Sequence, residues 1–191
     1  MLVFIHLLND RSGSPRILST IVNDYSIKKH SIKIFISESS NGFFDYHAQD
    51  IITYWYKPST LFKPITLVYY LFSQMLLFFK LLLNNDIPKD AILYLNTMLP
   101  FGGALYGFIT RRKIIFHLHE TNVRPFLLSA FLKLIIRITA ERVIYVSNYH
   151  RNTLAIKNVK STIAYNALDK NFTQLAGSNN YSPYSSSTFN V

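Results

Sequence analysis

The stretch K-I-I-F-H-L-H-E-T, at residues 113–121, decides the fold of this chain. Its apolar centre, residues 114–116, is β-branched and aromatic, which suits a buried strand because such side chains pack well on a pleated surface. Helical patterns flank the stretch on both sides, as is typical of a parallel strand in an α/β sheet. Ligands bind beyond the carboxyl ends of such strands, and His119 and Glu120 lie at that end.

The rest of the chain alternates between the same two patterns. Strand-like runs occur at residues 2–8, 32–36, 51–56, 91–95, 142–146 and 161–165. Helical periodicity occupies residues 15–30, 61–83, 124–139 and 148–157, and a further helix follows the glycine-bearing loop at 96–104. This order predicts a Rossmann-like α/β fold, with a mostly parallel sheet of about seven strands and helices on both faces.

The length of 191 residues fits one domain followed by a short tail. Residues 1–172 are expected to form a single Rossmann-like domain. Residues 173–191 are rich in Ser, Asn and Gly and carry no charge, so we expect a disordered tail or the start of an interdomain linker. The chain has no cysteine, which excludes disulfides, thiol catalysis and cysteine-based zinc sites.

The chain is strongly basic, with 20 Lys and Arg against 10 Asp and Glu and a formal net charge of +10. Such a balance favours an anionic partner. Nucleic acid is not expected, because the basic residues alternate with long aliphatic runs and no nucleic-acid-binding motif occurs. An anionic membrane surface or a phosphate-bearing substrate fits better, and a solvated basic face is the plainer alternative.

The helix expected at residues 61–83 has an unusually wide apolar surface. Its polar residues fall within one arc of roughly a third of the helical wheel. They are Lys63, Thr66, Tyr70, Ser73, Gln74 and Lys80. The apolar remainder must either pack deeply or contact lipid. The uncharged run at 64–79 is shorter than the ~18–20 residues that cross a bilayer, so we expect peripheral association with the cytoplasmic face of a membrane.

The first strand leads through a polar turn into a helix, as in nucleotide-binding units. Ser12, Gly13 and Ser14 would offer backbone amides to a phosphate at the helix N-terminus, with Ser14 as the cap. An ordinary turn between strand and helix explains the same residues, since both the G-x-G-x-x-G and the G-K-[ST] patterns are absent.

His117 and His119 share one face of their strand, because they are two residues apart. Two ligands on one strand do not make a metal site and the sequence places no third, so no metal is expected. His117 lies deeper and is expected in the core. His119, with Glu120 to orient it, is a candidate general base, although a structural role explains the pair equally well.

Five motifs occur in one order along the chain. They are H-L-L-N-D-R-S-G-S-P-R (6–16), N-T-M-L-P-F-G-G-A (96–104), I-I-F-H-L-H-E-T (114–121), E-R-V-I-Y-V-S-N-Y (141–149) and I-A-Y-N-A-L-D-K-N-F (163–172). Together they resemble the N-terminal half of a group 1 (family 4) GT-B glycosyltransferase. In that family two Rossmann-like domains face each other across a cleft. The N-terminal domain mostly holds the acceptor, and the C-terminal domain holds most of the nucleotide-sugar donor.

The resemblance implies which residues line the site. His119 and Glu120 match the strand-end pair of the acceptor pocket and would be the catalytic residues. The first loop would lie against the donor phosphates, and the loop after the fourth strand would lie on the same rim. The implied substrate-binding residues are Ser12, Gly13, Ser14, Asn96, Thr97, Gly102, Gly103, Ser147 and Asn166.

The resemblance also implies an activity. A sugar would pass from a nucleotide-sugar donor, which is a substrate and not a cofactor, to an acceptor glycan or lipid-linked saccharide in cell-surface polysaccharide or glycolipid biosynthesis. The donor domain is not part of this sequence, so we expect the isolated chain to be inactive. A truncated reading frame, a fragment of a longer protein, or a donor domain on a separate partner chain would each explain this. Two other functions stay open: a non-catalytic membrane-associated or partner-binding module, and a dinucleotide-dependent enzyme, which the missing glycine motif disfavours.

Overall fold

The computed structural model describes residues 1–27, 30–38, 42–44, 51–58 and 62–166, so the tail predicted at 173–191 lies outside the described residues. Seven strands form one sheet: β1 (Leu2–Ile5), β2 (Ile32–Ser37), β3 (Ile51–Tyr54), β4 (Ile92–Asn96), β5 (Lys113–Leu118), β6 (Arg142–Tyr145) and β7 (Lys160–Ile163). Their order is β3-β2-β1-β4-β5-β6-β7, and every neighbouring pair is parallel. The predicted α/β fold is confirmed.

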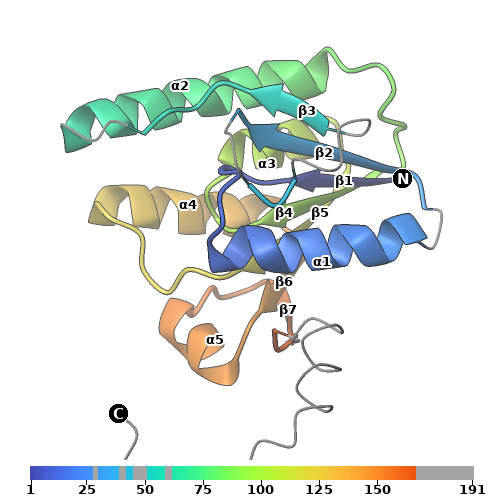
Figure 1. The fold of residues 1–191 in the computed structure, drawn as a ribbon. Helices are drawn as coiled ribbons and strands as arrows, with labels where there is room; N and C mark the ends of the chain where they lie inside the picture. The colour runs from blue at the N-terminus through green and yellow to red at the C-terminus, as the bar shows by residue number, and fades with distance from the viewer. Residues whose placement is uncertain (28–29, 39–41, 45–50, 59–61, 167–191) are drawn as a thin grey trace, which may run out of the picture.

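Helices cover both faces of the sheet, as predicted (Figure 1). On one face lies α1 (Gly13–Ile27), where Leu18 and Val22 join a core cluster with residues of β1 and β2. On the other lie α2 (Lys63–Leu82), α3 (Phe101–Ile109) and α4 (Phe126–Thr139), whose buried side chains form the larger core cluster. A short helix, α5 (Asn148–Leu154), follows β6. Because all strands are parallel, the loops after β1, β4, β5 and β6 meet at one edge.

The long helix α2 buries a mixed face. Ser73 and Gln74 are 0% and 1% exposed, whereas their neighbours Phe72 and Met75 are 52% and 58% exposed. Tyr70, Leu77 and Leu81 share the buried face, so it is more polar than the apolar stripe that an ordinary surface helix turns to the core. By length and composition α2 could also cross a membrane. Of the two alternatives that the sequence left for its apolar face, deep packing does not hold for most of that face.

Hydrogen bonds explain how α2 buries polar groups. The Tyr70 hydroxyl donates to the carbonyl of Leu99 at 2.6 Å, and the Gln74 side-chain carbonyl accepts from the amide of Gly102 at 3.2 Å. Ser73 donates to the carbonyl of Tyr70 within the helix, at 2.7 Å. A buried polar group is tolerated when it is bonded. The polar arc of α2 is therefore a docking face for the start of α3.

The helix α4 buries Ser129 together with the apolar Leu132 and Ile136, while a row of large apolar residues is exposed. That row comprises Phe126, Leu127, Phe131, Leu134 and Ile138. The outer surfaces of α2 and α4 thus each expose several large apolar side chains, and a monomeric soluble protein usually avoids large exposed apolar patches.

Candidate functional site

Asn96, the last residue of β4, is the centre of a polar cluster at the carboxyl edge of the sheet. Its side chain is fully buried. The amide nitrogen donates to the carbonyl of Ser14 in the first turn of α1 at 3.0 Å, and the amide oxygen lies 2.9 Å from His119 Nε2. The backbone carbonyl of Asn96 accepts from His6 Nδ1 at 3.0 Å. One residue thus connects the segments that follow β1, β4 and β5, as the resemblance implied for Asn96 and His119.

The orientation of Asn96 fixes the tautomer of His119. Only the Nδ2 group can donate to the Ser14 carbonyl, so the oxygen faces the imidazole and Nε2 must carry the proton. The Nδ1 atom of His119 is then an acceptor. Burial lowers the pKa of His119 to about 3, with smaller contributions from the nearby imidazoles of His117, His6 and His150. The side chain is therefore neutral at physiological pH.

Glu120 does not orient the His119 ring in the way that we predicted. Its carboxylate accepts from the backbone amides of Met98 and His119, both at 3.4 Å, and burial raises its pKa. It joins the loop after β4 to the loop after β5. Asn96 instead orients the imidazole. The physical reason is the direction of the side chain. The Glu120 carboxylate folds back towards its own backbone, so its nearest donors are backbone amides and not the imidazole ring.

Thr97 lies in a strained conformation beside this carboxylate. Its φ is 84°, a left-handed value that is unusual for a β-branched residue. The backbone amide donates to the carbonyl of His117 at 2.7 Å, and the hydroxyl accepts from the amide of Leu99 at 3.3 Å. Such outliers persist where the surroundings hold them, and they gather at functional sites.

Three further histidines surround the cluster, and the sequence reasoning assigned none of them to a binding role. His6 follows β1, His117 lies in β5 and His150 lies in α5; all three are buried. His117 Nδ1 is 2.7 Å from the Tyr94 hydroxyl, and its ring lies 4.2 Å from the ring of His119. The expectation that His117 lies in the core is confirmed. Burial lowers the pKa values of both His6 and His117 to about 4.

The order of the strands in the sheet identifies His6 as a neighbour of Asn96 and His119. In the sheet β1 pairs with β4, and β4 pairs with β5. Residues just past the ends of these strands therefore lie together, and His6, Asn96 and His119 are those residues. His150 is different, because its Nε2 donates to the carbonyl of Glu120 at 2.7 Å from a helix whose position the sequence does not fix.

The first loop is open around Gly13. A β-carbon placed on Gly13 would have no atom within 4 Å, so a ligand has room to approach the start of α1. The helix begins at Gly13, so Ser14 lies in its first turn and is not the cap that we predicted. The amide of Ser12 already donates to Asp10 Oδ1 at 3.0 Å, and its hydroxyl donates to the same oxygen at 2.6 Å. The Asp10 carboxylate therefore already binds one of the backbone amides that we predicted would bind a phosphate.

Gly102 and Gly103 do not lie on the rim of the site, which corrects the prediction. Both are buried in the first turn of α3. A β-carbon on Gly102 would lie 2.2 Å from the backbone oxygen of Gln74, and one on Gly103 would lie 2.7 Å from a methyl group of Ile5. The glycines let α3 approach α2 and β1 closely, so a packing requirement explains them.

Ser147 and Asn166 also have positions outside the cluster. Ser147 caps α5, where its hydroxyl accepts from the amide of His150 at 3.0 Å. It supports the cluster only through His150. Asn166 is exposed three residues after β7 ends, and the structure gives it no hydrogen bond with any other described residue. The structure therefore brings together His119, Glu120, Asn96, Thr97 and the backbone of Ser14.

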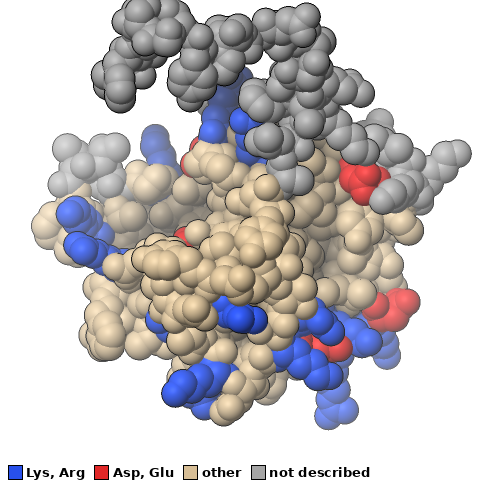
Figure 2. Space-filling model, turned by 90° about the horizontal axis from the view of Figure 1, so that it is seen from below, with Lys and Arg blue, Asp and Glu red and all other residues tan. Residues whose placement is uncertain are grey.

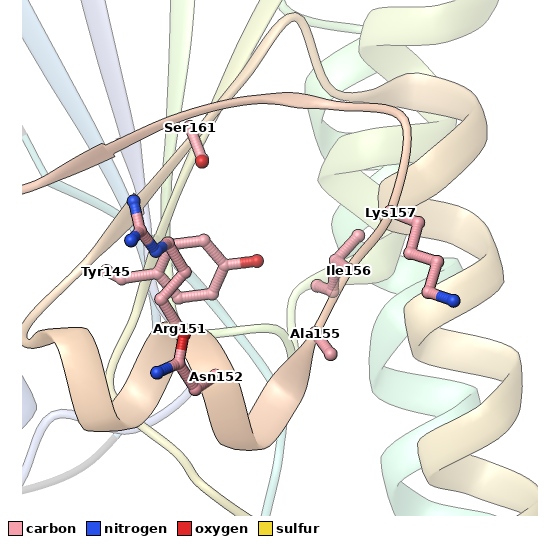
Figure 3. A pocket seen from close by; sticks show the side chains of 7 residues that line it. All are labelled: Tyr145, Arg151, Asn152, Ala155, Ile156, Lys157 and Ser161. Carbon is pink, nitrogen blue, oxygen red and sulfur yellow. The ribbon is translucent and has the colours of Figure 1, made fainter.

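Further hollows lie outside the cluster. An apolar groove of about 820 Å³ opens between the starts of α2 and α4. A second hollow, of about 420 Å³, lies between β6, α5 and β7, with the Tyr145 ring and Arg151 side by side and Lys157 pointing away (Figure 3). It contains no predicted site residue. Within the described ranges, no group of three or more His, Cys, Asp or Glu side chains is placed to hold a metal ion.

Basic side chains prevail on the face where α5 and β7 lie. Figure 2 shows that face, with more Lys and Arg than Asp and Glu on it and uncharged surface between them. Exposed cations there include Arg142, Arg151, Lys157 and Lys160. The excess of positive charge that the sequence carries is thus present on the folded surface.

Comparison with known proteins bears on the fold. No protein-family model matches the sequence, and no curated protein matches it. Among solved structures, HepE of Anabaena in complex with UDP and glucose matches with a TM-score of 0.60 and 17% identity, over 89% of this chain and 45% of HepE. MurG of Acinetobacter baumannii matches with a TM-score of 0.49 and 13% identity, over 88% of this chain and 46% of MurG.

The chain thus spans less than half the length of each of these two proteins. HepE is a GT-B glycosyltransferase, and the likeness to it shows the fold. This chain has the fold of one half of a GT-B glycosyltransferase, as its motifs implied.

Proposed function

We propose that this chain is the acceptor-side half of a glycosyltransferase, which transfers a sugar from a nucleotide-sugar donor to an acceptor hydroxyl. The observation behind the proposal is the cluster in which Asn96 joins His119 to the start of α1, at the carboxyl edge of a half GT-B fold. HepE, which shares the fold, was solved with UDP and glucose bound. The acceptor would belong to cell-surface polysaccharide or glycolipid biosynthesis.

His119 would position the acceptor hydroxyl. Its Nδ1 atom has no hydrogen-bond partner among the described residues and can accept the proton of a hydroxyl. Because the pKa of His119 is lowered to about 3, the ring is a weak base, and hydrogen bonding in the neutral form is its main contribution. Glu120 is assigned a positioning role, since it holds the two loops through their backbone amides.

The nucleotide diphosphate would lie against the start of α1. Backbone amides at a helix N-terminus attract anions, and the open space around Gly13 admits a ligand. The donor half would come from a second domain or a separate chain. The nucleotide-sugar is a substrate in this scheme, and the proposal includes neither a metal nor another cofactor.

The protein would work at the cytoplasmic face of a membrane. The exposed apolar surfaces of α2 and α4 would enter the lipid interface, while Lys63 and Arg124 would contact anionic headgroups. The same surfaces favour a second candidate function, a non-catalytic module that binds membranes. Measured sugar transfer would favour the glycosyltransferase half over the non-catalytic module.

The test is sugar transfer by this chain combined with a donor half. His119→Ala is expected to reduce the rate by about a hundredfold, because the acceptor hydroxyl loses the group that positions it. His30→Ala, which changes an exposed histidine just before β2, is the matched control and should keep full activity. Residues 1–191 alone should transfer almost no sugar. Full activity of His119→Ala would remove the proposed role, and no transfer in any combination would favour the non-catalytic module.

A further inference from the structure

The groove between α2 and α4 has the chemistry of a site for an anionic amphiphile. Its walls are mostly apolar, from Pro64, Leu67, Val123, Pro125 and Leu128, and its volume of about 820 Å³ lies within the range of small-molecule sites. Lys63 and Arg124 also line it, and neither has a hydrogen-bond or ion-pair partner in the described part of the chain. Among the described residues, no acidic side chain lines the groove. Two free cations beside an apolar channel suit a ligand with one anionic end and a hydrocarbon chain.

The groove lies beside the polar cluster, since Tyr70 lines it and also interacts electrostatically with Glu120. Leu7 follows His6, Leu99 is two residues beyond Thr97, and Val123 is three residues beyond Glu120; all three line the groove. The loops that hold the cluster therefore also form the inner wall of the groove. A chain lying in the groove would bring its polar end toward the edge where His119 lies.

The groove also opens onto the apolar surfaces. Figure 1 shows α2 and α4 beginning on the same side of the molecule. Phe62, Ile65, Phe126 and Leu127 are exposed next to these helix starts. A hydrocarbon chain that enters the groove from a membrane would therefore meet exposed apolar side chains beside its mouth.

We propose that this groove binds the lipid anchor of the acceptor, a hydrocarbon chain that carries a phosphate. The chain occupies the space between Leu67 and Leu128, and the phosphate pairs with Lys63 and Arg124. The identity of the lipid as the acceptor rests on the proposed function. The binding of a phosphate-bearing amphiphile does not, because it follows from the groove itself.

The experiment is calorimetric titration of residues 1–191 with decyl phosphate below its critical micelle concentration. One saturable site is expected. Lys63→Glu and Arg124→Glu should each weaken binding about three- to tenfold, because each replaces an attraction at an exposed site by a repulsion. Leu128→Trp should weaken it by about tenfold or more, since displacing two methylenes from the groove costs about 1.6 kcal/mol.

Arg137→Glu is the matched control. It makes the same charge change on an exposed residue of α4 that does not line the groove, so affinity should stay within about twofold. Thermal unfolding of each variant checks that the fold is kept. If Leu128→Trp unfolds, Leu67→Trp on the opposite wall replaces it.

Four results would overturn the proposal. They are equal affinity for inorganic phosphate, equal affinity for uncharged decyl maltoside, unsaturable uptake, and equal effects of the Arg124 and Arg137 variants. The first would show a simple anion site, and the second and third would show only apolar surface. Binding of decyl phosphate without any sugar transfer would leave the groove assignment intact and remove the proposed function. Sugar transfer to a water-soluble acceptor without decyl phosphate binding would do the reverse.

Discussion

Two regions depart from the usual pattern in which apolar side chains are buried and polar ones exposed. They are the carboxyl edge of the sheet and the outer surfaces of α2 and α4. At the edge, polar side chains such as Asn96 and His117 are buried. On the helices, apolar side chains such as Phe72 and Leu127 are exposed. At the edge, the chain itself offsets the cost of burying polar groups, because most of these groups have hydrogen-bond partners. On the helix surfaces, the cost of exposing apolar side chains is not offset, because nothing in the described part of the chain covers them.

The difference separates what the fold explains from what needs an external partner. A bonded polar cluster can be stable on its own and still be ready for a ligand, so its existence alone does not show a function. An exposed apolar surface costs solvation free energy unless something covers it. The helix surfaces are thus the stronger sign of a partner, and the edge is the stronger sign of specific chemistry.

Acidification should affect the edge most. Burial lowers the pKa values of His6 and His117 from 6.5 to about 4, so the unfolded chain binds protons at a higher pH than the folded chain. Stability is then fully present above about pH 6.5 and is lost as the pH falls towards 4, by about 3 kcal/mol for each imidazole. The raised pKa of Glu120 opposes part of this loss.

Urea unfolding at several pH values measures the effect of acidification. The His117→Phe variant should keep a weaker dependence on pH, because one buried imidazole is gone. A midpoint that stays constant from pH 7 to pH 4 would show that the histidines are not buried as described.

Asn96→Ala should have the next largest effect. It leaves the Ser14 carbonyl and the His119 Nε2 proton without partners and opens a small cavity, so we expect a loss of about 3 kcal/mol. Asn23→Ala, at an exposed position of α1, is the control and should change stability by less than about 0.5 kcal/mol. Equal effects of the two changes would mean that the cluster does not stabilise the edge.

The fold could be predicted from the sequence because strands and helices alternate with clear periods. The neighbourhood of Asn96 and His119 could be predicted too, since the ends of parallel strands share one edge. The role of Glu120 could not, because it depends on a side chain folding back by a few ångströms. Gly102 and Gly103 were assigned to the rim because a glycine pair after a strand looks the same whether it faces a ligand or another helix.

The direction of α2 could not be predicted for a related reason. The sequence shows a polar arc and an apolar remainder, and the usual rule places the apolar part inward. Here the start of α3 offers a carbonyl at Leu99 and an amide at Gly102 to Tyr70 and Gln74. These tertiary hydrogen bonds hold Tyr70 and Gln74 inward on the same buried face as Leu77 and Leu81, and periodicity alone carries no information about them.

Gly102→Ala tests what holds α2 in this direction. Its new methyl group would collide with the backbone oxygen of Gln74, which cannot move without the helix, so we expect a loss of about 2 kcal/mol. Gly13→Ala, where the space is open, should be neutral or slightly stabilising. Thermal unfolding measures the stabilities of the two variants. A tolerated Gly102→Ala would mean that α2 is not held against the start of α3.

The smallest effect on stability should come from the helix surfaces, where Met75 and Leu127 are 58% and 79% exposed. The double change Met75→Ser and Leu127→Ser should alter the free energy of unfolding by less than about 0.5 kcal/mol. Binding to anionic vesicles, measured by flotation, should nevertheless fall by about 30- to 700-fold, because each of the two side chains contributes about 1–2 kcal/mol when it enters lipid. Rising salt should weaken the binding of the unmodified chain as well.

Tyr149→Ser in α5 is the control for this last prediction. It removes an exposed aromatic side chain from a different part of the surface, and binding should stay within about twofold. Equal loss in the control and the double variant would mean that apolar surface anywhere on the protein drives binding. Equal binding of the unmodified chain to neutral and anionic vesicles would remove the role of the cations. A stability loss of several kcal/mol in the double variant would show that these surfaces are covered within the protein, and the comparison with the edge would no longer hold.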